Sequence, residues 1–175
     1  MSKKSLSESD ICDRFISPAL SEAGWANHQW RREYSFTAGR IIVRGKLVAR
    51  GKQKRADYLL FYKPNMPIAI IEAKDNNHAV GAGMQQALGY SNSLDVPFVF
   101  SSNGDGFLFH DKTGQSPQIE TTLSLHEFPS PDELWAMTFA KANAWRDRFA
   151  AVSTPDKSGS WTLRFYQEIA VRRVL

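Results

Sequence analysis

Two carboxylates and a lysine have the types and spacing needed for phosphodiester chemistry. Glu72 and Lys74 end the segment PIAIIEAKD, and Asp57 lies earlier, in ADYLLFY. Alternate residues of a strand point to the same face, so Glu72 and Lys74 are expected to project together while Ala73 faces away. Two converging carboxylates repel each other, and a hard divalent cation with oxygen ligands resolves that repulsion. The pattern therefore predicts a Mg²⁺ site.

The chemistry expected at such a site is phosphodiester hydrolysis. Mg²⁺ held by Asp57, Glu72 and the backbone carbonyl of Ala73 can bind a phosphate and lower the pKa of a bound water, and Mn²⁺ is expected to substitute. Lys74 can hold the attacking water or neutralise charge that builds on the phosphate. The simpler alternative is a Glu72–Lys74 salt bridge with Asp57 unrelated. A charged pair at the end of a buried apolar run is costly without a purpose, which favours the site.

Two adjacent strands must bring these residues together. The segments ADYLLFY and PIAIIEA are separated by KPNM, in which Pro64-Asn65 favours a turn. A hairpin through this turn places the partner of Glu72 at or near Tyr58, which brings Asp57 close. PIAIIEA is nearly all apolar, as expected of a central strand buried on both faces.

The remaining pattern predicts an α/β domain, with a mixed central β-sheet flanked by helices. A helix is expected over Ser7–Ala23, capped by Ser7 or Ser9 and stopped by Gly24. Further expected elements are short strands between Trp30 and Ala73, a helix over His78–Leu94, two strands around Asn103-Gly104, a connection over 111–131 and a helix over Pro131–Val152. The glycines at 81, 83 and 89 suggest close packing of the second helix against the sheet.

The composition and net charge of the chain limit its possible functions. The chain has 175 residues and a net charge of +4, which suits one mildly basic globular domain. Residues 40–55 hold seven Lys or Arg and no acidic residue, so Lys52, Lys54 and Arg55 are candidate DNA contacts, with a solvated hairpin as the alternative. A single cysteine excludes an internal disulfide and a multi-cysteine zinc site. Neither a secretory signal nor a membrane-length apolar run is present, so a cytoplasmic location without membrane association is expected.

The order RADYLLFY, PIAIIEAKD and GMQQALGY resembles the PD-(D/E)xK nuclease superfamily. More narrowly, it resembles the N-terminal domain of type I restriction endonuclease R subunits, as do SESDICDRFISPALSEAGW and VPFVFSSNGDGFLFHD, over about residues 8–150. One departure is Ala56, which stands where the superfamily usually has proline.

The resemblance implies a restriction-endonuclease-like core with Asp57, Glu72 and Lys74 as catalytic residues. It also implies that Gln86 and Tyr90 orient the site or contact DNA, with Gln85 as the alternative in another register. Some relatives add an acidic residue from the first helix, and four candidates stay open: Glu8, Asp10, Asp13 and Glu22.

The segment LRFYQEIAVRRVL resembles the entry to the helicase-like motor of these subunits, where Gln167 would lie near adenine. No G-x-x-x-x-G-K-[ST] motif occurs in the sequence, so ATP is expected to concern only the full-length subunit. The expected division is residues 1–152 for a PD-(D/E)xK nuclease domain, 153–162 for a linker and 163–175 for the start of a truncated helicase-like ATPase domain. A short amphipathic helix is the alternative for the last segment.

The function expected from the resemblance is that of a type I site-specific deoxyribonuclease. The chain would perform Mg-dependent endonucleolytic cleavage of double-stranded DNA, with ATP-driven translocation supplied by the motor. Its partners would be the specificity and methyltransferase subunits of the restriction complex. Two alternatives stay open: a nuclease-fold DNA-binding or docking module without cleavage activity, and another nuclease of the PD-(D/E)xK superfamily.

Overall fold

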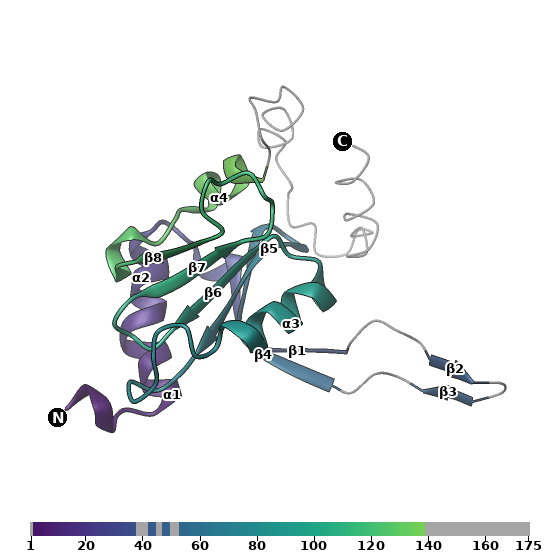
Figure 1. Ribbon diagram of the computed structural model, residues 1–175, viewed down its shortest axis with the longest axis horizontal. Coiled ribbons are helices and arrows are strands. Elements are labelled where there is room, and N and C mark those ends of the chain that lie inside the picture. The colour runs from purple at the N-terminus through teal and green to yellow at the C-terminus, as the bar shows by residue number, and fades with distance from the viewer. Residues whose placement is uncertain (1, 38–41, 45–46, 50–52, 139–175) are drawn as a thin grey trace.

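A computed structural model of the chain describes residues 2–37, 42–44, 47–49 and 53–138. Its centre is a six-stranded sheet in the order β1-β4-β5-β6-β7-β8 (Figure 1). The β5–β6 pair is parallel and the other four pairs are antiparallel, which confirms the predicted mixed sheet. The strands are β1 (Trp30–Thr37), β4 (Gln53–Lys63), β5 (Met66–Ala73), β6 (Phe98–Ser102), β7 (Phe107–Asp111) and β8 (Glu120–Leu123).

A separate antiparallel ribbon extends beyond the ends of β1 and β4 (Figure 1). It consists of β2 (Ile42–Arg44) and β3 (Leu47–Ala49). This ribbon lies in the basic segment, whose Lys52 is outside the described residues.

The predicted first helix forms as three consecutive segments: α1 (Glu8–Ile11), a π-helical turn (Cys12–Ile16) and α2 (Ser17–Glu22). Ser7 caps it, because Ser7 Oγ accepts the Asp10 N–H at 3.2 Å and the Asp10 carboxylate accepts the Ser7 N–H at 3.0 Å. Gly24 ends it with a left-handed φ of 88°. Short 3-10 turns occur at Lys3–Ser5, Asn27–Gln29 and Leu125–Glu127.

The second helix, α3 (Met84–Leu94), begins later than the predicted His78. The preceding residues form turns, and side chains of β6 and of the turn after it form hydrogen bonds with their backbone groups. Asn103 Nδ2 donates to His78 O at 2.8 Å and Ser101 Oγ donates to Val80 O at 2.6 Å.

The glycine interpretation holds for two of three positions. A Cβ at Gly81 would lie 2.7 Å from Leu108 Cδ2, and one at Gly83 would lie 3.0 Å from Glu72 Cγ. Gly89 faces open space, so the packing explanation is wrong there.

The C-terminal part of the described chain differs from the prediction in one element. The connection over 111–131 contains β8, which pairs with the outer edge of β7. The last described helix is α4 (Pro131–Met137), capped by Ser130. The rest of the helix predicted over 131–152, the predicted linker 153–162 and the predicted motor segment 163–175, including Gln167, lie outside the described residues.

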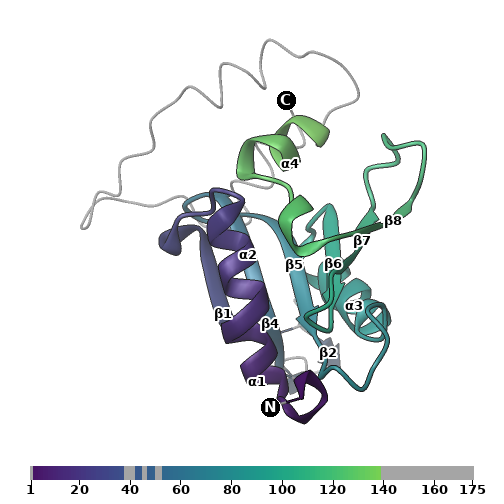
Figure 2. The ribbon, with the colours of Figure 1, turned by 90° about the vertical axis from the view of Figure 1, so that its left-hand side faces the viewer.

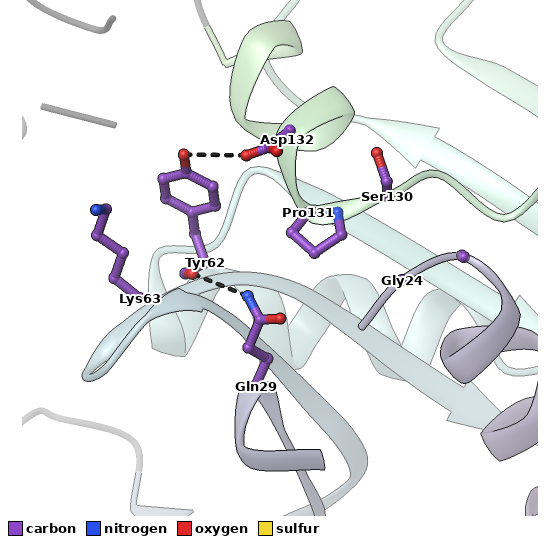
Figure 3. Close-up of a pocket in the computed structure, with 8 residues that line it drawn as sticks. Gly24, Gln29, Tyr62, Lys63, Ser130, Pro131 and Asp132 are labelled. Carbon is purple, nitrogen blue, oxygen red and sulfur yellow. Dashed lines mark hydrogen bonds between the residues drawn. The ribbon is translucent and has the colours of Figure 1, made fainter. Parts of the chain in front are cut away.

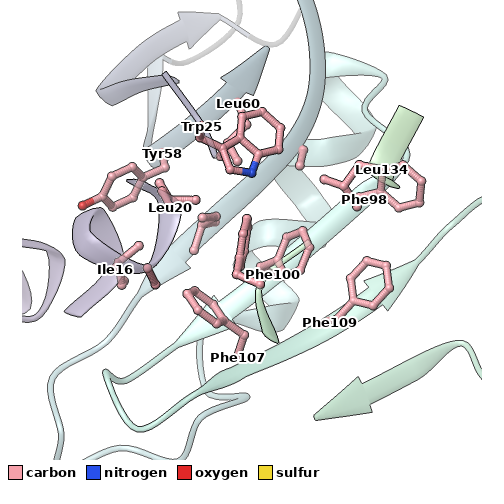
Figure 4. Packing of buried hydrophobic residues seen from close by; sticks show 14 of the residues in the cluster. Ile16, Leu20, Trp25, Tyr58, Leu60, Phe98, Phe100, Phe107, Phe109 and Leu134 are labelled. Atoms are coloured by element: carbon pink, nitrogen blue, oxygen red, sulfur yellow. The ribbon is translucent and has the colours of Figure 1, made fainter. Parts of the chain in front are cut away.

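Helices cover both faces of the sheet (Figure 2). On one face, Ile11, Ile16 and Leu20 from the first helix and Leu134 from α4 pack against aromatic residues of the strands (Figure 4). On the other face, α3 packs against a second cluster that includes Ile70. Every residue of β5 is buried, so the prediction of a central strand buried on both faces is confirmed. Within the described part of the chain, no helix has the length and apolarity required to cross a membrane.

Candidate active site

The β4–β5 hairpin brings Asp57 beside Glu72. The two strands pair antiparallel across the Pro64-Asn65 turn, where Asn65 has a left-handed φ of 61°. Tyr58 pairs with Ile71, so the register differs by about one residue from the predicted one and sets Asp57 level with Glu72. The predicted hairpin is thus confirmed.

Asp57 is fixed by a backbone group of the neighbouring strand. Its Oδ2 accepts the N–H of Ala73 at 2.7 Å. Burial raises the pKa of Asp57, while the Ala73 N–H and the charge of Lys74 lower it. One carboxylate oxygen therefore has a strong donor, and the carboxyl group is held against the end of β5 between Glu72 and Lys74.

The strand ladder on the other side of Asp57 is interrupted. Arg32 pairs with Tyr58 and Tyr34 pairs with Ala56, but Glu33, which lies between them, has a left-handed φ of 50°. A non-glycine residue in this conformation costs free energy, and such positions concentrate at functional sites. The strain in β1 therefore lies directly beside Asp57.

Glu72 is the most buried charged side chain of the cluster, with 2% of its surface exposed. Its Oε1 accepts a hydrogen bond from Gln86 Nε2, and its Oε2 is buried without a hydrogen-bond partner in the described structure. Burial, followed by the charge of Asp57, raises the pKa of Glu72 to about 8, although Lys74 opposes this shift. A buried carboxyl group with an orphaned oxygen is suited to a bound cation, which would restore its ionised form.

Lys74 lies between two carboxylates. Its Nζ is 3.6 Å from Glu72 Oε1 and 3.6 Å from Glu8 Oε1. Burial alone would lower the pKa of Lys74, but the charges of Glu72, Glu8 and Asp57 raise it above its usual value. The Lys74 ammonium group is therefore kept protonated beside these carboxylates.

Only one of the four acidic candidates of the first helix reaches this cluster, namely Glu8. Asp10 accepts hydrogen bonds from Ser7, Asp13 pairs with Arg32, and Glu22 lies 2.9 Å from His126. Sequence reasoning left the choice open, because helix periodicity does not say which end of the helix meets the sheet edge.

Gln86 and Tyr90 lie on one face of α3, as residues four apart do. Gln86 Nε2 donates to Glu72 Oε1 and also to Tyr90 Oη at 3.1 Å. The Tyr90 ring packs edge-on against Phe36, with the centroids 5.4 Å apart. The contact to Glu72 is made by Gln86 rather than by Gln85.

The predicted basic contacts have different surroundings. Lys54 Nζ lies over the Tyr90 ring, 5.5 Å from its centroid, and is thereby linked to the site through Gln86. Arg55 is exposed and pairs with Glu33 at 3.6 Å.

The cluster offers a cation carboxylate oxygens, the ligand type that Mg²⁺ uses, and none of the thiolate or imidazole ligands typical of zinc sites. Among the described residues, no three His, Cys, Asp or Glu side chains are gathered to cage a metal. Mg²⁺ commonly uses one or two carboxylates and keeps several waters. Asp57 and Glu72, one of them with a buried unpartnered oxygen, supply that donor set.

A cavity of about 430 Å³ lies elsewhere, between the Gly24 turn, the end of β4 and the start of α4 (Figure 3). Several of its polar groups bond to one another, since Tyr62 Oη donates to Asp132 at 3.2 Å and Gln29 Nε2 donates to Tyr62 O at 3.0 Å. Tyr62 is five residues beyond Asp57, which is roughly 17 Å along an extended strand. None of the predicted site residues lines this cavity.

Comparison with known proteins shows the family of the chain. Residues 25–129, more than half of the chain, match the family model described as type I restriction enzyme R protein N terminus. The chain is 49% identical over 132 residues to the type I restriction enzyme EcoAI endonuclease subunit of Escherichia coli, covering 74% of this chain and 16% of that protein. It is 26% identical over 226 aligned positions to the EcoKI endonuclease subunit of E. coli strain K12, covering 98% of this chain and 19% of that protein.

A solved structure is also similar. It is a fragment described as an HsdR subunit of a type I restriction enzyme from Vibrio vulnificus, with a TM-score of 0.67 and 38% identity over 97% of this chain and 32% of that one. The chain thus spans less than a fifth of the length of the two curated relatives. On this evidence the chain belongs to the family of type I restriction enzyme R-protein N-terminal regions.

Proposed function

We propose that this chain supplies the magnesium-dependent site that cuts double-stranded DNA in a type I restriction enzyme. The observation that carries the proposal is the β4–β5 register, which sets Asp57 level with Glu72, while Lys74 Nζ lies 3.6 Å from Glu72 Oε1. The buried, unpartnered Oε2 of Glu72 supports a cation ligand rather than a simple ion pair, because a salt bridge alone leaves that oxygen unsatisfied.

Asp57, Glu72 and the carbonyl of Ala73 would hold the magnesium ion, which supplies Lewis-acid activation of a water and of the scissile phosphate. The Ala73 N–H points toward Asp57, and in an antiparallel pair the N–H and C=O of one residue face the same strand. This supports the Ala73 carbonyl as a ligand on the Asp57 side.

The chain's own side chains have separate roles in this proposal. Lys74 holds the attacking water and offsets negative charge that builds on the phosphate, which its raised pKa favours. Gln86 orients the Glu72 carboxylate. Tyr90 and Lys54 form a polar and aromatic surface beside it for the DNA backbone, and Arg55, together with Lys52, adds positive charge.

The chain covers only a small part of its relatives, and the remaining roles belong to the proposed whole subunit. In that subunit a motor domain would translocate DNA with ATP, and Gln167 would serve the adenine site. Its partners in the restriction complex, the specificity and methyltransferase subunits, would recognise the DNA sequence.

Replacement of Lys74 tests the proposal directly. In an assembled restriction enzyme that carries this sequence, Lys74→Ala should abolish DNA cleavage and leave ATP-driven translocation intact. Lys63→Ala, at the far end of β4, is the matched control and should cut like the wild type. Cleavage at the wild-type rate by Lys74→Ala would show that the domain does not use this site, and would favour a DNA-docking role.

A further inference from the structure

Ser101 lies beside the candidate site, and the sequence does not single it out for catalysis. It is on β6, directly opposite Glu72 in the parallel register, and is fully buried. Its hydroxyl donates to Val80 O at 2.6 Å and accepts the Gly83 N–H at 3.0 Å. Both partners belong to the segment between Lys74 and α3, so one hydroxyl ties that segment to the sheet.

Gly83 is the N-cap of α3, and no side chain of the helix itself caps it. The Ser101 hydroxyl therefore takes the role of a cap from the neighbouring strand. A Cβ at Gly83 would lie 3.0 Å from both Glu72 Cγ and Ser101 Oγ. The start of α3 is thus held in direct contact with the stem of the Glu72 side chain.

This contact determines where Gln86 lies. Gln86 follows Gly83 by three residues, and its amide donates to Glu72 Oε1. A shift of α3 by one residue would move Gln86 by about 1.5 Å along the helix axis and rotate it by about 100°. The hydrogen bond to Glu72 would then be lost.

We propose that Ser101 is a positioning residue for DNA cleavage, which acts by fixing the start of α3 against Glu72 so that Gln86 orients the metal-binding carboxylate. The inference rests on the proposed nuclease function, since it assigns Ser101 a role in that same site. Gly83 belongs to the same arrangement, because a Cβ at this position would push Glu72 or Ser101 away by a few tenths of an ångström.

Ser102 provides a matched control for Ser101. It is the next residue of β6, is equally buried, and also makes two hydrogen bonds, to Gly106 O at 2.8 Å and from the Gly104 N–H at 3.1 Å. Neighbouring strand residues face opposite sides of the sheet, so Ser102 does not contact α3. Ser101→Ala and Ser102→Ala should therefore lower Tm by similar amounts, but only Ser101→Ala should change metal binding and cleavage.

The expected results separate positioning from stability. In the assembled enzyme, Ser101→Ala should reduce the cleavage rate by about 10- to 100-fold and raise the Mg²⁺ concentration for half-maximal rate, as loss of a group that orients a ligand does. Ser102→Ala should stay within about twofold of the wild type, well short of that loss. In the 175-residue chain, calorimetry should show weaker Mn²⁺ binding for Ser101→Ala, and the NMR signal of the Gln86 side-chain amide should lose its carboxylate-bonded shift.

A second pair of variants avoids removal of a hydrogen bond. Gly83→Ala should impair cleavage and shift the Gln86 signal, whereas Gly89→Ala, on the same helix but facing open space, should leave both unchanged. Wild-type metal dependence and an unshifted Gln86 signal in both Ser101→Ala and Gly83→Ala would overturn the proposal. A wild-type enzyme that fails to cut would instead overturn the proposed function, because the Gln86 signal reads the positioning without cleavage.

Discussion

The Oδ2 atom of Asp57 accepts the backbone N–H of Ala73 at 2.7 Å. This single hydrogen bond joins the carboxylate of β4 to the residue that separates Glu72 from Lys74 on β5. It holds the Asp57 carboxylate at the end of β5, through one of its two oxygens. The geometry of the candidate site therefore depends on the hydrogen bond between the Asp57 side chain and the backbone at the end of β5.

Asp57 variants should separate this structural bond from metal binding. Asp57→Asn keeps an oxygen that can accept the Ala73 N–H, so it should retain most of the stability while it loses Mn²⁺ binding. Asp57→Ala loses both, and its free energy of unfolding should fall by about 1–3 kcal/mol because the Ala73 amide becomes unsatisfied. Urea denaturation and calorimetric Mn²⁺ titration measure the two effects. Wild-type Mn²⁺ affinity in Asp57→Asn would exclude Asp57 as a ligand.

The stability of the metal-free chain should depend on pH through Glu72. Its pKa is raised from 4.5 to about 8 by burial and by Asp57, so the folded state favours the protonated form. This contribution is complete below the unfolded pKa and is lost as the pH rises through about 8. One pKa unit corresponds to about 1.4 kcal/mol, so the loss between about pH 5 and pH 9 should amount to a few kcal/mol at most.

Glu72→Gln removes the titrating group and keeps the shape, so its free energy of unfolding should change little over the same pH range. Denaturation midpoints of the two proteins, measured without divalent cations, test this. Addition of Mg²⁺ near pH 8 should stabilise the wild type, since the cation favours the ionised carboxylate, and should not stabilise Glu72→Gln. Parallel pH curves for the two proteins would contradict the assigned role of Glu72.

Gln86 should matter more than its neighbour. Gln86→Ala removes the donor to Glu72 and should lower the cleavage rate and weaken Mn²⁺ binding by about 10- to 100-fold. Gln85→Ala removes an exposed amide of the same helix and serves as the control. Tyr90→Phe keeps the ring that packs against Phe36 and loses only the hydroxyl that accepts from Gln86, so a smaller effect is expected. Equal losses in Gln85→Ala and Gln86→Ala would indicate a general effect on the helix.

Glu8 should contribute to the site, whereas Asp13 should not. Glu8→Gln removes one of the carboxylates that surround Lys74, and the cleavage rate should fall by about tenfold because Lys74 is less well positioned. Asp13→Asn loses an exposed ion pair with Arg32, which is worth at most about 1 kcal/mol, and should cut at the wild-type rate. Cleavage assays on the assembled enzyme measure both. A Glu8→Gln enzyme with wild-type activity would leave Glu8 as a surface partner of Lys74 only.

The sequence by itself determined the parts of this molecule that depend on local periodicity. Alternation predicted that Glu72, near the end of β5, and Lys74, just after it, project together. The Pro64-Asn65 turn predicted the β4–β5 hairpin, and helical spacing predicted that Gln86 and Tyr90 share one face of α3. These relationships span a few residues or one turn, so residue types and spacing are sufficient to predict them.

Tertiary structure decided the relationships between segments far apart in the chain. It selected Glu8 over Asp10, Asp13 and Glu22, because only the start of α1 meets the edge of the sheet near Lys74. It also delayed the start of α3 to Met84, because Ser101 and Asn103 bind backbone groups that a helix would otherwise use. The edge strand β8 formed because the backbone groups on the outer edge of β7 were available for hydrogen bonding. Such contacts depend on which surfaces meet after packing, and periodicity along one segment carries no information about them.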